Sequence, residues 1–341
     1  MTELIVTNFN RNFTGVSATA AGVVRVQAGR YDLALTDVAL PGCPAPVSRA
    51  EARRLSRDPG ARPVTIWHVR RNSEMRAALW ARDVLRLPVR IVFTSAAQRR
   101  HSALPRWLIS RMDAVIATTD AAADFVPHVR AVVPHGVDCE RFSPAPDRAA
   151  AWRATGHPGA RGIATIGRIR PEKGTDRFVD AMCAVLPRHP DLIALVIGRA
   201  AHADRAFLDR LRAQAAAAGL ADRLLFVGEM APEAVCALLP GLSLIVQLPR
   251  YEGYGLVPLE GLACGVPFVA AEAGHYAEFS AQGRAGIVTG DAAAAISGIL
   301  DDPARHAAMA RAAREMATQH YSVTREADGI GAVYEALWSE G

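Results

Sequence analysis

Two glutamates separated by seven residues, Glu252 and Glu260, form the most informative chemical pattern in this sequence. Gly253 and Gly255 lie between them, and an apolar run at 242–248 precedes them. The pattern predicts a buried strand, a glycine loop and a helix N-terminus, in that order. Glycines let the backbone approach a ligand closely, and the free N–H groups of a helix start favour an anion such as phosphate.

A carboxylate next to a phosphate site is electrostatically unfavourable unless it binds something else. Sugar hydroxyls are suitable partners, because they donate hydrogen bonds to carboxylate oxygens. The pattern therefore predicts a phosphorylated, hydroxyl-rich ligand, and a sugar nucleotide fits that description.

A second segment with chemical potential, Gly-Arg-Ile-Arg-Pro-Glu-Lys-Gly at 167–174, follows a predicted strand at 162–166. Lys173 in this segment is the only lysine among 39 basic residues. All other basic residues of the chain are arginines. A lysine at this one position therefore indicates that the site requires a compact, rotatable ammonium group. We therefore predict that Lys173 contacts a phosphate.

Alternating strands and helices are predicted to position these groups. The first series of expected strands spans 4–6, 33–35, 64–67, 89–93 and 114–117. The second spans 162–166, 192–197, 224–227, 242–248, 268–270 and 286–288. Such alternation indicates an α/β fold with two doubly wound parallel sheets, whose ligand loops follow the carboxyl ends of the strands. Helices are expected at 74–85, 105–111, 175–186 and 206–218, among others.

Three regions are expected along the chain. Residues 1–150 form a first domain, 151–320 a second, and 321–341 a C-terminal helix, with a polar, proline-containing linker at 143–159. The chain of 341 residues is half apolar, which suits two globular domains. Its apolar runs are too short to cross a bilayer and its start lacks the basic residues of a secretory signal, so a cytoplasmic protein is expected. Five scattered cysteines without a C-x-x-C pair indicate reduced thiols.

The charge is unevenly distributed. Residues 1–150 carry 21 arginines against 13 acidic residues, whereas the remainder carries 18 basic and 21 acidic residues. This excess favours an anionic partner for the first domain, with a membrane face, a phosphorylated acceptor and nucleic acid as candidates and solvated arginines as the simpler alternative. Basic residues and histidines that follow two of the strands are the candidate contacts: His68, Arg70, Arg71, Arg99, Arg100 and His101.

The segment 252–269 resembles the E-x7-E signature of retaining glycosyltransferase family 4, the group 1 glycosyltransferases. Residues 167–174 resemble the diphosphate-binding segment of the same family. Among the subgroups of this family, the lipopolysaccharide core mannosyltransferases are the most similar. The segments 7–16, 67–72 and 93–99 carry that resemblance. The resemblance implies a GT-B fold: two Rossmann-like domains facing a central cleft, the first for the acceptor and the second for the nucleotide sugar, with the C-terminal helix returning to the first.

The resemblance also implies roles for individual residues. Arg168 and Lys173 would meet the charge of the departing diphosphate, and Glu252 would hold hydroxyls of the transferred sugar; these three are the catalytic candidates. The donor-binding candidates share loops at the strand ends: Gly15, Gly167, Gly198, Arg199, Gly228, Gly253, Tyr254, Gly255, Leu256, Val257 and Glu260, with Glu260 on the ribose. The six basic residues and histidines above would contact the acceptor.

The chain departs from the family at one position. Many members have a histidine directly after the strand that corresponds to 89–93, where it contacts the donor sugar, but this chain has Thr94 and Ser95. Either another group makes that contact or His101 does.

The expected function is transfer of a hexose, mannose from GDP-mannose, to a lipopolysaccharide inner-core acceptor, with retention, by an enzyme on the cytoplasmic face of the inner membrane. The chain contains no D-x-D, so neither a metal nor a cofactor is expected. The alternatives are a UDP-sugar donor with another glycolipid or a small acceptor, a sugar-nucleotide epimerase of the same fold, and a non-catalytic nucleic-acid binder. A dehydrogenase is disfavoured because Pro258 stands where the third glycine of its fingerprint belongs, and a P-loop enzyme because Lys173 follows Glu172.

Overall fold

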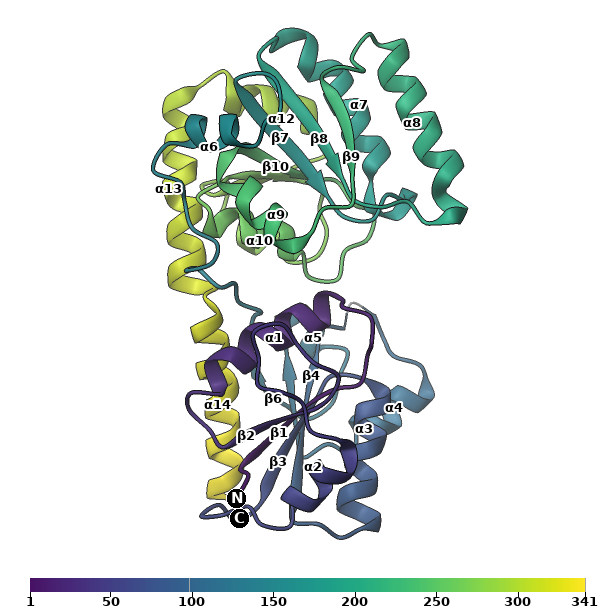
Figure 1. Ribbon diagram of the computed structural model, residues 1–341, viewed down its shortest axis with the longest axis vertical. Coiled ribbons are helices and arrows are strands. Elements are labelled where there is room, and N and C mark those ends of the chain that lie inside the picture. Colours follow the sequence, from purple (N-terminus) through teal and green to yellow (C-terminus); the bar gives the residue numbers. More distant parts are fainter. Residues whose placement is uncertain (98, 341) are drawn as a thin grey trace. The chain divides into compact units, whose positions relative to one another are not determined.

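The computed structural model describes residues 1–97 and 99–340, which divide into two units (Figure 1). Unit 1 comprises Met1–Gly136 together with the C-terminal segment from Tyr321, and unit 2 comprises Val137–His320. The division falls earlier than the expected boundary at 150. The segment expected to be a linker instead contains helix α6, Arg148–Ala154, which Asp147 caps and whose Trp152 is buried against Gly162 of unit 2.

Unit 1 is built on one parallel six-stranded sheet, in the order β2-β1-β3-β4-β5-β6. The strands are β1 Leu4–Asn8, β2 Leu33–Asp37, β3 Thr65–Val69, β4 Val89–Ser95, β5 Ala114–Ala117 and β6 Val129–Val132. Five of these strands contain or overlap the predicted runs, and β4 extends beyond its run to include Thr94 and Ser95. The parallel sheet that the sequence predicted is therefore confirmed for this unit.

Helices cover both faces of the unit 1 sheet, because the strands are apolar on both sides. One face carries α2 Arg49–Leu55, α3 Asn72–Leu79 and α4 Ala103–Ile109, and α3 continues as the π-helix η1, Trp80–Val84, where a single α-helix was expected. The other face carries α1 Gly15–Gln27 and α14 Val323–Ser339, whose Tyr334 and Trp338 are core residues. A short helix, α5 Asp120–Ala123, follows β5. The C-terminal helix thus completes the core of unit 1, which confirms its predicted return.

Unit 2 has a second parallel sheet of six strands, in the order β12-β11-β10-β7-β8-β9. The strands are β7 Arg161–Ile166, β8 Leu192–Ile197, β9 Leu224–Gly228, β10 Leu242–Gln247, β11 Phe268–Ala270 and β12 Gly286–Val288. The strand order reverses between β7 and β10, which are neighbours in the sheet. A reversal of this kind leaves a crevice at the carboxyl ends of the two strands, where α/β proteins bind ligands. The loop after β7 and the loop after β10 are the two segments that carried the chemical signals.

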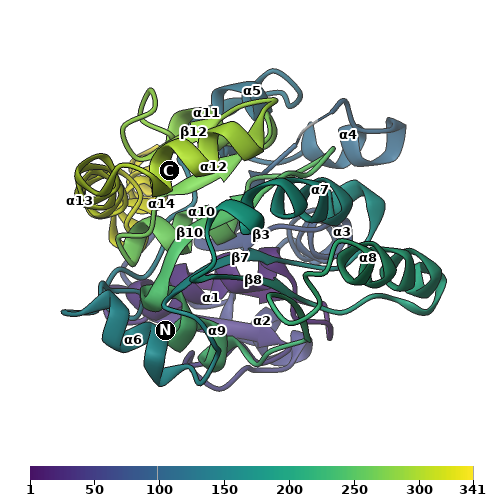
Figure 2. The same cartoon turned by 90° about the horizontal axis from the view of Figure 1, so that it is seen from above.

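The unit 2 helices pack around this sheet. They are α6, α7 Thr175–Val185, α8 Arg205–Ala217, α9 Pro232–Leu238, α10 Leu256–Ala263, α11 Tyr276–Phe279, α12 Ala292–Leu300 and α13 Pro303–His320, with short 3-10 turns η2 Pro171–Lys173, η3 Leu186–Arg188, η4 His202–Asp204 and η5 Leu239–Gly241. Side chains of α7, α8 and α12 form one core with the strands, and Figure 2 shows α7 and α8 side by side. None of the helices in the described part of the chain is long and apolar enough to cross a membrane.

Candidate functional site

The loops that follow β7 and β10 are joined backbone to backbone. The carbonyl oxygen of Glu172 accepts hydrogen bonds from the backbone N–H groups of Arg250, at 2.9 Å, and Tyr251, at 3.4 Å. These two segments lie far apart in the sequence, but the switch point of the sheet brings them together. The two motifs therefore belong to one site within unit 2.

Lys173 and Glu252 form an ion pair at the centre of this site. The Lys173 Nζ donates to Glu252 Oε2 at 2.7 Å, and the backbone N–H of Gly253 donates to Glu252 Oε1 at 2.9 Å. The side chains are 23% and 19% exposed, so a ligand can reach both. The carboxylate holds the ammonium group of the chain's one lysine in place, next to the glycine loop.

Glycine is required at three close approaches in the loops of this site. Gly174 has φ +68°, and a Cβ there would lie 1.8 Å from the carbonyl oxygen of Leu248. Gly255 has φ +101°, and its Cβ would lie 2.1 Å from the ring of Tyr276. Gly198 would place a Cβ 1.8 Å from the carbonyl oxygen of Gly167. A side chain at Gly174 or Gly198 would push adjacent site loops apart, and one at Gly255 would collide with the Tyr276 ring.

The N-terminus of α10 opens on this glycine loop. Gly255 is its N-cap and offers no capping side chain, so the N–H groups of its first turn, including those of Leu256 and Val257, receive no side-chain cap. The helix N-terminus carries partial positive charge, which favours an anion.

Glu260 lies one turn further into α10. It is half-buried, and burial raises its pKa from an ordinary 4.5 to about 7, while the charge of Arg141 acts in the opposite direction. No described residue donates a hydrogen bond to this carboxyl, so its oxygens are available to hydroxyl groups of a ligand.

The remaining donor-site candidates of unit 2 lie on loops at the same edge of the sheet. Gly167 donates a backbone hydrogen bond to Ile197 at 2.9 Å, and Gly198 donates one to Gly228 at 2.8 Å. Arg168 is exposed, and Arg199 is exposed beside Glu229, at 3.6 Å. The structure therefore gathers the loops after β7, β8 and β9, because adjacent parallel strands end side by side.

Tyr254 differs from the other residues of the glycine loop. Its side chain is buried, and its ring stacks on that of His275 with centroids 5.3 Å apart and planes 13° from parallel. The ring therefore stabilises the loop from within and is not available to a ligand. His275 had no motif to mark it in the sequence.

Arg250 is a site residue that the sequence analysis missed. Its guanidinium donates to both carboxylate oxygens of Asp176, at 2.8 and 2.6 Å, and to the carbonyl oxygen of Pro171 at 2.6 Å. The side chain thus ties the loop after β10 to the start of α7. Only its place directly before the E-x7-E segment could have drawn attention to it.

Breaking this clamp is expected to weaken donor binding. Arg250→Gln should raise the KM for the donor by about fivefold with a smaller effect on kcat, because the two site loops lose their fixed spacing. Both side chains are partly exposed, so the free energy of unfolding should change by less than about 1 kcal/mol. Steady-state kinetics and urea unfolding measure both quantities. An unchanged KM in Arg250→Gln and in Asp176→Asn would show that the clamp does not position the loops.

In unit 1 the structure corrects the prediction for His68. This residue has no exposed surface, and its Nδ1 and Nε2 atoms contact Tyr334 Oη at 2.5 Å and Thr94 Oγ1 at 2.7 Å. Burial lowers its pKa well below the ordinary value. His68 therefore joins β3 and β4 to helix α14, and it is not available to an acceptor.

Arg70 and Arg71 are also partly used inside unit 1. Arg71 donates to Asn8 Oδ1 at 3.1 Å, to Glu74 Oε1 at 3.0 Å and to Ser17 Oγ at 3.0 Å. Burial lowers the pKa of Arg70, whose Nη1 is buried without a hydrogen-bond partner in the described part of the chain. If these two arginines contact the acceptor as predicted, they would do so through the parts of their side chains that stay exposed.

Glu74 organises this corner and was not singled out from the sequence. It is fully buried, and it accepts hydrogen bonds from Thr7 Oγ1 at 3.0 Å, from the N–H groups of Phe9 and Arg70 at 3.2 and 2.8 Å, and from Arg71. A buried carboxylate with four donors fixes the loops after β1 and β3.

The other candidates in unit 1 are more accessible. Arg99 and Arg100 are exposed in the loop after β4, and Gly15 is exposed as the first residue of α1. His101 is half-buried; burial lowers its pKa, and its Nε2 has no hydrogen-bond partner among residues 1–97 and 99–340. Their predicted contacts with acceptor and donor stay predictions.

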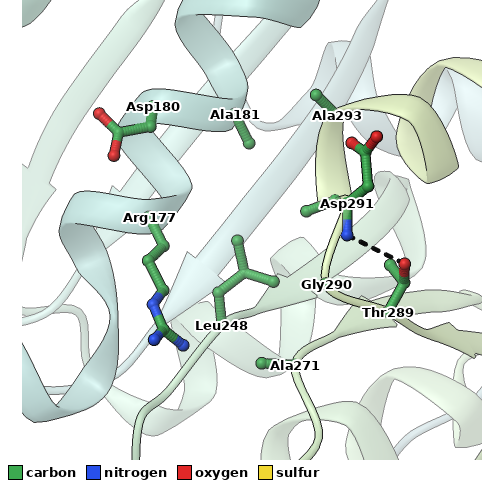
Figure 3. Close-up of a pocket in the computed structure, with 10 residues that line it drawn as sticks. Arg177, Asp180, Ala181, Leu248, Ala271, Thr289, Gly290, Asp291 and Ala293 are labelled. Atoms are coloured by element: carbon green, nitrogen blue, oxygen red, sulfur yellow. Dashed lines mark hydrogen bonds between the residues drawn. The ribbon is translucent and has the colours of Figure 1, made fainter.

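A separate cavity of about 550 Å³ lies between α7 and the N-terminus of α12. Arg177, Asp180, Leu248 and Asp291 are among the residues around it, whereas Lys173 and Glu252 are not (Figure 3). It therefore lies beside the site and does not contain the ion pair. The five cysteines are free, and no three His, Cys, Asp or Glu side chains of the described residues gather as a metal site.

Known proteins are similar to this chain over nearly its whole length. The family model described as Glycosyl transferases group 1 matches residues 153–316. The lipopolysaccharide core biosynthesis mannosyltransferase LpcC of Rhizobium leguminosarum bv. viciae is 40% identical over 98% of this chain and 96% of its own length. The corresponding LpsB of Rhizobium meliloti (strain 1021) is 41% identical over 98% of this chain and 97% of its own length.

Solved structures agree on the fold. Anabaena Alr3699/HepE in complex with UDP and glucose matches with a TM-score of 0.81, at 17% identity, over 98% of this chain and 100% of that one. This likeness confirms the predicted GT-B fold. The near-full-length relatives and the matched family model lead to one conclusion: the chain belongs to the group 1 glycosyl transferases and is a glycosyltransferase.

Proposed function

We propose that the chain transfers mannose from GDP-mannose to an inner-core sugar of lipopolysaccharide, with retention of configuration. The observation that carries the donor side is the pairing of Lys173 with Glu252 beside the N-terminus of α10. The names of the Rhizobium relatives support mannose and the lipopolysaccharide core.

The leaving group explains the positive groups of unit 2. Breaking the bond between sugar and phosphate places negative charge on the departing diphosphate. Lys173, Arg168 and the N–H groups of Leu256 and Val257 would meet that charge, and fixed groups of this kind lower the barrier because they need no reorganisation.

The two glutamates would hold the sugars. Glu252 would accept hydrogen bonds from hydroxyls of the transferred hexose, and Glu260 from the ribose. In the proposed front-face reaction the leaving phosphate oxygen takes the acceptor proton, so the scheme assigns no side chain as base. It also assigns no metal or cofactor, because the chain's own cations would balance the diphosphate.

Product analysis tests the proposal against its alternatives. The full chain is incubated with labelled GDP-mannose, or with labelled UDP-hexoses, and a truncated inner-core lipopolysaccharide. Free sugar, isomerised donor and lipid-linked product are then separated. Lipid-linked mannose with the anomeric configuration of the donor, assigned by NMR, is the expected result. Isomerised donor without acceptor would indicate an epimerase, and transfer from UDP-hexoses alone would overturn the choice of GDP-mannose.

Donor affinity is expected to depend on pH through Glu260. Its carboxyl is protonated below a pKa of about 7 in the free protein, and a protonated carboxyl is a poorer acceptor for ribose hydroxyls. Below pH 7 the donor Kd should therefore rise by up to about tenfold per pH unit. Calorimetric titration with GDP between pH 5.5 and pH 8, about the range of the transition, measures this effect.

Two further readings accompany that titration. Glu260→Gln should bind GDP more weakly at pH 8 and lose the pH dependence. In the wild-type chain, donor affinity should rise with pH, whereas the free energy of unfolding should fall. The pKa of Glu260 in the folded chain lies above the ordinary 4.5, so the folded state binds the proton more strongly and stability falls as pH rises from 4.5 to about 7. A pH dependence that persists in Glu260→Gln would assign it to another group.

A further inference from the structure

Unit 1 exposes a group of large apolar side chains on one of its helical layers. Trp80 and Val84 of the π-helix η1 are 43% and 63% exposed, and Leu104 and Trp107 of α4 are 58% and 53% exposed. Scattered exposed apolar residues need no explanation, but two tryptophans with aliphatic neighbours on adjacent elements do. We name these four residues the apolar face.

Three of the four residues of the apolar face, Trp80, Val84 and Trp107, line one hollow. A depression of about 660 Å³ has Trp80, Val84, Trp107 and Arg76 among its lining residues. Leu104 and Trp107 are three residues apart in α4, so they lie on the same side of that helix. The π-helix η1 continues α3 with a wider turn, and its first and last residues, Trp80 and Val84, are exposed.

Positive charge surrounds this face. Residues 70–111 contain ten arginines and two acidic residues, and one of the two, Glu74, is buried. Arg76, Arg106 and Arg111 are exposed. The guanidinium of Arg111 lies over the ring of Trp107 at 5.3 Å, and that of Arg53 lies over Trp80 at 4.8 Å.

Exposed tryptophans and aliphatic residues edged by arginines have a known physical preference. Tryptophan favours the boundary between lipid headgroups and acyl chains, where one end of the side chain is apolar and the other is hydrated. Arginine meets lipid phosphates while its stem lies along apolar surface. A second copy of the same face would bring like charges together, which disfavours self-association.

We propose that the apolar face docks unit 1 onto an anionic lipid bilayer. Trp80, Val84, Leu104 and Trp107 enter the interface, and Arg76, Arg106 and Arg111 bind lipid phosphates. The exposed tryptophans and the arginines around them select a bilayer by their own chemistry. The inference rests on the proposed function only in that both involve a lipid. The docking surface thus differs from the acceptor contacts predicted at Arg99, Arg100 and His101.

Tryptophan fluorescence offers a direct test. Trp67, Trp152 and Trp338 are buried, so only Trp80 and Trp107 can change environment on docking. The full chain is mixed with vesicles of phosphatidylcholine alone, or of phosphatidylcholine and phosphatidylglycerol. A blue shift and co-sedimentation are expected with the anionic vesicles, and both should weaken as salt increases. Equal binding to both vesicle types, or binding to neither, would overturn the proposal.

Paired variants separate apolar contact from folding. The double variant Trp80→Ser with Trp107→Ser should sediment with anionic vesicles at least about tenfold more weakly. The double variant to Phe should still sediment but lose the blue shift. Val227→Ser, which alters an exposed apolar residue of unit 2, is the matched control and should bind normally. Normal binding by the double Ser variant would contradict the proposal, and concentration-dependent dimerisation lost in that variant would assign the face to a second copy.

Activity distinguishes this inference from the proposed function. The double Ser variant should retain wild-type release of mannose from GDP-mannose in solution, because none of these residues lies in the donor site. If the wild-type chain binds anionic vesicles but transfers no mannose, the proposed function fails and the docking surface stands. If mannose transfer is normal and vesicle binding is absent, only the docking surface fails.

Discussion

Lys173→Ala is expected to lower kcat by about a hundredfold or more, because a fixed positive charge facing the leaving group is lost. The effect on stability should be small. The ammonium group has Glu252 as its hydrogen-bond partner, at 2.7 Å, and both side chains are partly solvated, so the free energy of unfolding should fall by less than about 1 kcal/mol. Single-turnover kinetics with saturating donor and chemical unfolding measure the two effects separately.

Two controls narrow the interpretation of that result. Lys173→Arg keeps the charge but not the compact ammonium, and it should recover only part of the rate. Arg177→Ala removes an exposed cation four residues along the chain and should leave turnover unchanged. Activity of Lys173→Ala close to wild type would remove Lys173 from the mechanism.

Gly174→Ala should disable the site through the backbone. The residue has φ +68°, and the new Cβ would lie 1.8 Å from the carbonyl oxygen of Leu248, so the loop after β10 must move away from the loop after β7. The expected cost is about 3 kcal/mol or more of stability, with a loss of donor affinity of at least about tenfold. Thermal unfolding and titration with GDP measure these changes.

Gly156→Ala is a matched control for that variant. Gly156 also lies in unit 2 and has φ +74°, but a Cβ there would meet nothing within 4 Å. It should cost only the backbone conformational term, about 1 kcal/mol, and should leave donor affinity unchanged. If the two variants proved equally destabilised, the close approach of the two loops would have no measurable role.

The sequence predicted the parts of the site that depend on local backbone rules. The strand, glycine loop and helix around Glu252 and Glu260 form as expected, with Gly255 in a left-handed conformation at the start of α10. The unusual placement of Lys173 also pointed to the site, since a single lysine among arginines is visible without a structure. Strand alternation was enough to predict two parallel sheets.

Residues that act through distant partners were not predictable in this way. His68 lies near the end of β3, shortly before the candidates Arg70 and Arg71, yet Tyr334 and Thr94 occupy its two ring nitrogens. Glu74 and Arg250 looked like ordinary surface charges, because important partners of each, such as Thr7 and Asp176, lie far away along the chain. The helix in the expected linker was missed because the burial of Trp152 against Gly162 outweighs the local Pro and Gly content.

The amino-acid sequence by itself determined most of the strands and helices, the two glycine loops and the kind of ligand they favour, because these follow from side-chain chemistry and from φ and ψ preferences over a few residues. Only the tertiary structure decided which charged groups are free and which are held. That depends on strand order: the reversal between β7 and β10 brings Lys173 to Glu252, and the burial behind α14 withdraws His68 from solvent. Contacts between residues far apart along the chain require the packed sheets to exist first, and no local pattern encodes them.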